Sequence, residues 1–124
     1  MQLFTENTKF YIEFAEGYED ETQPYVRKEL SLCEFLYIIT KRNHEVALQN
    51  LAEGFYGCYD KHKVLVKYDD KSEWELYDRF DLGNEYDWKC IFADLEQKLA
   101  KILEWKAWSE LVKEGKEEWE SRNA

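Results

Sequence analysis

The stretch EWELYDRFDLGNEYDW, residues 73–88, holds the densest group of side chains that could do acid–base chemistry, with six carboxylates and five aromatic rings in sixteen positions. A catalytic pair of carboxylates needs one desolvated member, so that the two pKa values separate. Asp78 is the acid that the expected sheet register places on an apolar face. A strand end that reaches solvent, or that pairs Asp78 with Arg79 or Lys89, explains this position more simply. We therefore predict no catalytic residue here.

Signals for metal and nucleophile chemistry are weaker still. Cys58 and His62 form a C-x3-H pair that Cys90 or His44 could extend, but zinc sites are normally marked by two ligand pairs. A nucleophilic pair of Cys58 and His44 lacks both a residue to hold the histidine and an oxyanion site. The glycine pattern EGFYGC lacks the lysine of a phosphate-binding loop. The sequence predicts no metal site and no cofactor, and it favours a protein without enzyme activity. An enzyme that uses Asp78, Cys58 or His62 stays open as an alternative, and it would require a buried, perturbed pair beside a pocket.

The charge balance restricts the partners of the protein. Twenty-seven Asp and Glu residues against seventeen Lys and Arg give a formal net charge of −10. No basic stripe is visible along the chain, so direct binding to nucleic acid or to an anionic membrane surface is disfavoured. The favoured partner is a basic protein, such as a nuclease or another nucleic-acid-binding protein.

Acidic side chains at strand spacing suggest how such a partner would be bound. Residues two apart on a strand point the same way at about 6.6–6.8 Å, so Glu73 and Glu75 stand at a spacing comparable with successive backbone phosphates. Interleaved aromatic side chains would supply affinity, and the charge would speed association. The alternative is that the acids only keep the protein soluble. The predicted partner-binding residues are Glu73, Glu75, Asp78, Asp81, Glu85, Asp87, Glu19, Asp20 and Glu21.

Length and composition predict one folded domain over residues 1–124. The chain is 44% apolar and 17% aromatic, which is too much hydrophobic material for a disordered chain. The N-terminus lacks the pattern of a secretion signal, and the longest apolar stretch, FLYII at 35–39, is too short to cross a membrane. Three widely spaced cysteines fit a reducing compartment. We expect a cytoplasmic protein that makes no membrane contact.

The first half of the chain predicts two strands and two helices. Period-two alternation indicates strands over 8–15 and 25–30. In LSLCEF, Ser31 can cap a helix that starts with the next residue, and Glu34 completes a capping box. A second helix is expected over about 45–53. The residues that the first helix would bury are Leu32, Phe35, Leu36 and Ile39.

Two further strands, HKVLVKYD and EWELYDRF, are expected to pair across a tight connection. Alternation predicts that both strands bury every second side chain. Tyr68 must then lie opposite Trp74. The predicted core residues of this pair are Val64, Val66, Tyr68, Trp74, Leu76 and Phe80.

The same register has consequences for the charged residues. It sets Lys67 opposite Glu75 on a solvated face. It also sets Lys63 opposite Arg79 and leaves Asp78 on the apolar side, so the pairing must fray or bulge toward that end.

From Trp88 to about Arg122 the pattern is helical and carries two apolar faces. Either the helix bends near Glu104 to Ala107, so that both faces reach one core, or it continues and offers the second face to another chain. The sequence leaves both arrangements open, and we expect residues 114–124 to fray. The predicted oligomer or partner face is Trp105, Trp108, Val112 and Trp119.

The sequence as a whole predicts an α+β fold, with an antiparallel sheet of about four strands, a helical pair inserted after the second strand, and a long C-terminal helix. The predicted function is contact with another protein. The favoured version inhibits or neutralises a nucleic-acid-handling protein, as an anti-defence or toxin-immunity protein that can mimic nucleic acid. The alternative is a homo-oligomer that binds a small ligand in an aromatic pocket between subunits.

Overall fold

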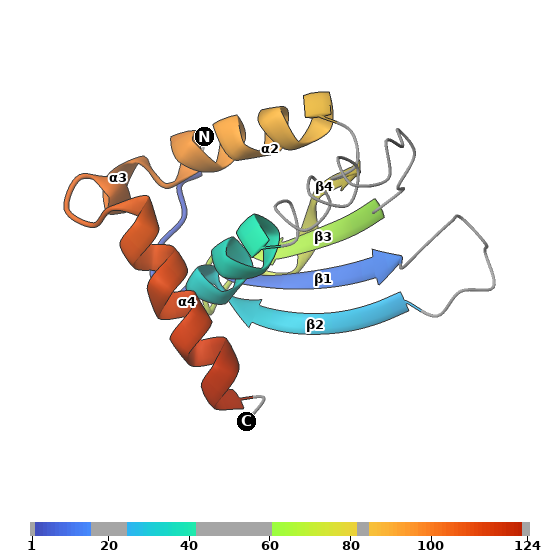
Figure 1. Cartoon of the computed structure of the whole chain (residues 1–124), viewed down its shortest axis with the longest axis horizontal. Coiled ribbons are helices and arrows are strands. Elements are labelled where there is room, and N and C mark those ends of the chain that lie inside the picture. Colours follow the sequence, from blue (N-terminus) through green and yellow to red (C-terminus); the bar gives the residue numbers. More distant parts are fainter. Residues whose placement is uncertain (1, 16–24, 42–60, 82–84, 123–124) are drawn as a thin grey trace, which may run out of the picture.

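The computed structural model describes residues 2–15, 25–41, 61–81 and 85–122 (Figure 1). Four strands and four helices occur in these ranges. The strands are β1 (Lys9–Ala15), β2 (Tyr25–Ser31), β3 (Lys61–Lys67) and β4 (Glu75–Asp81). A helix over 32–41 follows β2, and the last part of the chain forms α2 (Glu85–Lys98), α3 (Ala100–Leu103) and α4 (Trp108–Arg122). The predicted α+β class is confirmed, while the second predicted helix, at 45–53, lies outside the described residues.

The strands form one antiparallel sheet in the order β2-β1-β3-β4. Phe10 and Ile12 on β1, and Val64 and Val66 on β3, are fully buried. The side chains between them on the same strands are partly exposed. The described helices therefore cover one face of the sheet, and we call the other the open face. In Figure 1, α2 runs above β4 and α4 descends from α3 toward the level of β2.

The start of the 32–41 helix follows the predicted capping box. The backbone N–H of Glu34 donates to Ser31 Oγ at 3.2 Å, and the Ser31 N–H donates to Glu34 Oε1 at 3.1 Å. These two bonds satisfy backbone donors that the first helical turn leaves free. The helix buries all four of the residues predicted for it, namely Leu32, Phe35, Leu36 and Ile39.

The predicted long C-terminal helix is interrupted near Glu104 to Ala107. α2 and α3 are separated by one residue, Leu99, and after α3 the chain turns before α4 begins at Trp108. The break brings Leu111 of α4 into the same core as Leu95 and Ile102. Of the two arrangements that the sequence left open, the structure shows the bent one.

α4 packs tightly against the beginning of the 32–41 helix. Gly115 is buried, and a Cβ atom at this position would lie 1.9 Å from the carbonyl oxygen of Cys33. Only a residue without a side chain allows this approach. Two polar contacts from α4 hold the same junction: Ser31 Oγ donates to Glu118 at 2.6 Å, and an Arg122 N–H donates to the Glu29 carbonyl at 3.0 Å.

The same junction encloses a charged pair. Glu34 is almost fully buried, and its Oε2 lies 3.0 Å from Arg122 Nε. No donor is aligned on this oxygen, so the contact is an ion pair without a hydrogen bond. Because an unpaired buried carboxylate is costly, Arg122 compensates the charge of Glu34. Residues 114–122 thus belong to a helix with defined contacts, and their expected fraying stays a prediction about dynamics.

The β3–β4 pairing follows the predicted register only at the end that lies away from the connecting turn. Lys63 lies opposite Arg79 and Val64 opposite Asp78, as predicted. The register then shifts between Val64 and Leu65, so that Leu65 pairs with Leu76. The predicted irregularity is confirmed as a β-bulge, and β4 contains the extra residue.

The shift makes the predicted register wrong on the turn side of the bulge. Glu75 pairs with Val66, not with Lys67, and β3 ends before Tyr68 can pair with Trp74. A one-residue shift moves every following side chain to the other face. Trp74 and Leu76, predicted to be in the core, are therefore exposed. The side chain of Phe80 lies outside the described residues.

Candidate functional site

The β-bulge selects which aromatic side chain of β4 enters the core. Tyr77 packs edge-on against Phe4 and Phe10, and its hydroxyl donates a short hydrogen bond to the carboxylate of Asp94 on α2. Lys98 Nζ lies 4.8 Å from the centre of the Tyr77 ring and 3.2 Å from Asp94 Oδ2. Burial, followed by the hydrogen bond to Asp94, raises the pKa of Tyr77. The phenol stays protonated, so it ties β4 to α2 and cannot act as a base.

The same bulge leaves an apolar band on the open face. Trp74 and Leu76 are 38% and 50% exposed, and the Trp74 ring contacts the Tyr11 ring edge-on at 6.2 Å between centroids. Leu65 is the register partner of both Tyr11 and Leu76, so all four side chains lie together. We call Tyr11, Leu65, Trp74 and Leu76 the apolar band. Exposed clusters of this kind commonly mark interaction sites.

Positively charged side chains flank the apolar band on both sides. Lys9 is the register partner of Lys67, and Lys63 is the register partner of Arg79. Lys9 and Arg79 are exposed, and the other two are partly exposed. Each pair thus sets two cations directly across from each other on neighbouring strands.

Acidic side chains gather at the turn and the edge of β4. Glu73, Glu75 and Asp78 are all exposed. The turn before them is ordered by Asp69, whose Oδ1 accepts hydrogen bonds from the Lys71 N–H at 2.8 Å and the Ser72 hydroxyl at 2.9 Å. The bond from Ser72 is the main cause that lowers the pKa of Asp69. We call Glu73, Glu75 and Asp78 the acidic edge.

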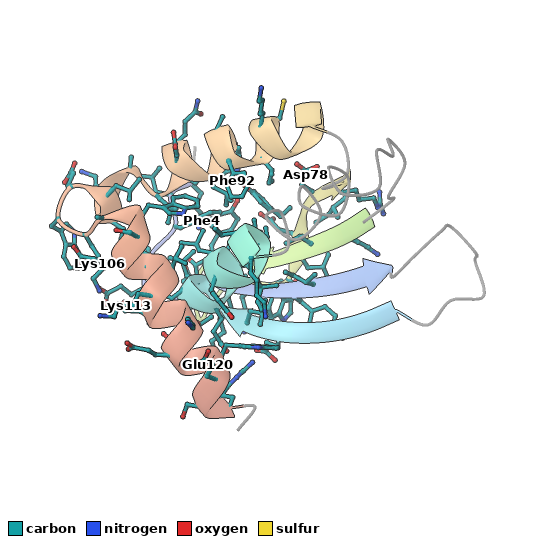
Figure 2. All side chains as sticks on the ribbon, viewed as in Figure 1. Phe4, Asp78, Phe92, Lys106, Lys113 and Glu120 are labelled. Atoms are coloured by element: carbon teal, nitrogen blue, oxygen red, sulfur yellow. The ribbon has the colours of Figure 1, made fainter. Side chains whose placement is uncertain are left out.

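Asp78 does not have the environment of a catalytic acid. Its backbone lies opposite Val64, on the apolar side, as predicted. Its side chain, however, is exposed, and its Oδ1 accepts the N–H of Arg79 at 2.7 Å (Figure 2). A solvated carboxylate lacks the desolvation that separates catalytic pKa values.

Several predicted partner-binding residues cannot be placed in the same detail. Glu19, Asp20 and Glu21 lie outside the described residues. Asp81, Glu85 and Asp87 fall within β4 and α2, but their side chains lie outside the described part. Among the predicted partner-binding residues, the structure describes the side chains of Glu73, Glu75 and Asp78, and all three are exposed.

A second candidate site is a pocket of about 290 Å³ between α4 and the start of the 32–41 helix. Cys33 lines it and donates to Glu114 Oε2 at 3.7 Å, while Lys106 Nζ binds Glu114 Oε1 at 2.8 Å. Burial, with the nearby charges of Glu118 and Glu114, raises the pKa of the Cys33 thiol to about 12. A thiol with this pKa remains protonated and is a poor nucleophile.

Comparison of the chain with protein families, with curated proteins and with solved structures finds no match. Any statement about the site therefore rests on its own residues. In the described ranges, no three His, Cys, Asp or Glu side chains are grouped so that they could hold a metal ion. The candidate ligands His44 and Cys58 lie outside those ranges, as does the side chain of His62. No helix in the described part has the length and hydropathy to cross a membrane.

The predicted oligomer face lies mainly against the core of its own chain. The Trp108 ring contacts the Phe92 ring at 5.8 Å between centroids, and Val112 and Trp119 also pack on the core. Trp105, in the turn before α4, is 65% exposed and is the exception. The bend at 104–107 explains this division, because it turns the second apolar face back toward the sheet.

The apolar band was missed by the sequence reasoning, although part of its signal was present. Tyr11 alternates with Phe10 and Ile12, and Leu65 with Val64 and Val66, which already sets both on the face away from the core. Asp78 on the apolar side predicted an irregularity in the pairing, but the sequence did not indicate that it would add Trp74 and Leu76 to this face.

Proposed function

We propose that this protein acts by contact and inhibits a nucleic-acid-handling protein by occupying its basic groove. One observation carries the proposal: Glu73, Trp74 and Glu75 are consecutive and all exposed where β4 begins. Trp74 and Glu75 point to opposite sides of this edge strand, so a groove that surrounds the edge would meet both a large apolar anchor and charges that attract a basic surface.

The setting of these residues favours binding without a large loss of conformational freedom. The turn before Glu73 is held by the two hydrogen bonds to Asp69. Trp74 is supported from one side by the Tyr11 ring. A surface fixed before binding loses less entropy when the complex forms.

The overall charge supports the same proposal. With a net charge of −10, the protein is drawn toward a basic groove before contact, and the association rate rises. A small protein that blocks a nuclease or a defence complex must reach such a basic groove quickly. We therefore propose an anti-defence or toxin-immunity role in the cytoplasm, with the acidic edge standing in for nucleic-acid phosphates.

The test begins with capture of a partner from native cell extract by the tagged protein, at low and at raised salt. The expected partner is stoichiometric, basic and lost at raised salt. The purified protein must also inhibit the nucleic-acid binding or cleavage of that partner.

A charge-reversed variant then tests the acidic edge directly. E73K/E75K/D78K should abolish capture and inhibition while leaving stability nearly unchanged. The matched control is E117K/E120K, which reverses two exposed acids on α4 (Figure 2 labels Glu120). Equal capture by the E73K/E75K/D78K variant and the unchanged protein would overturn the proposal.

A second candidate function is self-association through the turn before α4, with a small ligand bound between subunits. The exposure of Trp105 favours it, because a tryptophan that is 65% exposed is the most accessible large apolar side chain in the described part of the chain. Trp105→Asp should dissolve the assembly in sedimentation experiments. Trp108→Asp is unsuitable for this purpose, since Trp108 packs on Phe92.

A further inference from the structure

The open face of the sheet carries a repeating pattern that the proposed function does not use. A pair of cations, Lys9 and Lys67, stands on one side of the apolar band. A second pair, Lys63 and Arg79, stands on the other. Lys63 and Lys67 are four residues apart on β3, which separates the two pairs by about 13 Å.

This arrangement is unfavourable for the isolated protein. Like charges directly across from each other on neighbouring strands repel. Among the residues that the structure describes, no acid forms an ion pair with any of these four side chains. Two acids share the strand rows of this face: Glu13 on β1 is the register partner of Lys63, and Glu29 on β2 is exposed and is the register partner of Tyr11. Four cations on one face of a chain of net charge −10 still make this face complementary to an anionic partner.

The apolar band indicates which class of anionic partner fits this face. Trp74 and Tyr11 offer aromatic rings between the two cation pairs, with Leu65 and Leu76 beside them. Single-stranded nucleic acid combines phosphates with flat bases that stack on such rings. Bases between the phosphates that the two cation pairs bind would lie over the band. A duplex hides the faces of its bases and offers no such stacking.

We propose that the open face of the sheet binds single-stranded nucleic acid, with phosphates on the Lys9–Lys67 and Lys63–Arg79 pairs and bases stacked on Trp74 and Tyr11. The cations that form this surface lie far apart in the sequence and meet only through strand pairing. The proposal shares Trp74 with the proposed inhibition, but it rests on the two cation pairs, whereas the inhibition rests on the acidic edge.

The test is titration of a fluorescein-labelled oligothymidylate with the full-length protein, followed by fluorescence anisotropy at low salt. Saturable binding is expected, with quenching of tryptophan fluorescence. The logarithm of the binding constant should fall with the logarithm of salt concentration with a slope of about −3, as four phosphate contacts on a single strand predict. The same oligothymidylate annealed to its complement should bind at least 10-fold more weakly, because its bases cannot stack on the band.

Three variants locate the binding surface. K63E/K67E/R79E should weaken binding at least 10-fold, and Trp74→Ala should weaken it about 10-fold through lost stacking. The matched control K101E/K113E reverses two exposed cations on the helices and should cause less than a twofold change (Figure 2 labels Lys113). Circular dichroism spectra of all variants are the check that they remain folded.

Other results would overturn the proposal. These are the absence of saturable binding, equal weakening by K101E/K113E, or equally tight binding of a polyglutamate peptide of the same charge, which would indicate an acidic protein segment as the partner. E73K/E75K/D78K separates this proposal from the proposed function. That variant should keep or strengthen oligothymidylate binding, whereas it should lose capture of a basic partner.

Discussion

The two faces of the sheet differ in what determines their residues. On the covered face, Phe10 stacks on Phe35 of the 32–41 helix with ring centroids 3.9 Å apart, and the neighbouring aliphatic side chains are fully buried. On the open face, an aromatic contact between Tyr11 and Trp74 is left partly exposed, with two pairs of cations on either side. The covered face is shaped by packing, whereas the open face keeps large apolar side chains and like charges at the surface.

The largest effect should follow from filling the helix junction on the covered side. Gly115→Leu places a Cβ atom within 1.9 Å of the Cys33 carbonyl oxygen, so α4 must move away from the 32–41 helix. We expect a loss of about 3 kcal/mol or more in the free energy of unfolding. Urea denaturation measures it, with Lys113→Leu on the exposed side of the same helix as control. A loss below that of the control would show that the two helices are not in contact.

Two leucines compare the core beside the covered face with the open face. Leu95 of α2 is fully buried in the core, and Leu76 of β4 is half exposed on the open face. Leu95→Ala should cost about 2–5 kcal/mol in the free energy of unfolding, and Leu76→Ala less than about 0.5 kcal/mol. Chemical denaturation of both variants under the same conditions checks the difference. Similar losses would mean that something covers the apolar band in the free protein.

The tie between β4 and α2 should have a smaller effect. Tyr77→Phe keeps the aromatic packing but removes the hydroxyl that donates to Asp94. The expected loss is about 1.5–3 kcal/mol, because the acceptor is a charged carboxylate. Tyr11→Phe is the control from the open face and should change the melting temperature little. If Tyr77→Phe and Tyr11→Phe lower the stability equally, then the hydrogen bond that the bulge allows Tyr77 to make adds no stability.

The capping box should contribute less than the hydrogen bond between Tyr77 and Asp94. Ser31→Ala removes the acceptor of the Glu34 N–H and the donor to Glu118. We expect a loss of about 1 kcal/mol. Ser31→Asp, which keeps a capping oxygen but places a carboxylate beside Glu118, should recover only part of that loss. Full recovery would assign the effect to the cap alone.

The sequence and the structure agree where the signals are local. The capping box at Ser31 and Glu34 involves groups three residues apart, and the alternation of Phe10 and Ile12 follows from strand geometry. Each of these features depends only on residues within one or two turns of a helix or within a few residues of one strand. The class of the fold could be predicted from such signals.

The candidate site could be predicted only in part. Glu73 and Glu75 were identified from their spacing and Asp78 from the charge that follows them, and the structure leaves all three exposed. The apolar band escaped prediction, since it depends on a one-residue shift between β3 and β4. Regular alternation placed Trp74 and Leu76 in the core, and the irregularity predicted from Asp78 did not indicate which side chains it would move to the other face.

The sequence by itself determined the alternating strands, the helix start at Ser31 and the excess of acid, because each depends on neighbouring residues or on composition alone. The tertiary structure decided three further features. It bent the chain at 104–107 so that α4 could bury Leu111, it turned Tyr77 inward, and it gathered Lys9, Lys63, Lys67 and Arg79 on one face. Each of these depends on which strands and helices become neighbours. That choice is made by the packing of the whole core and not by any short segment.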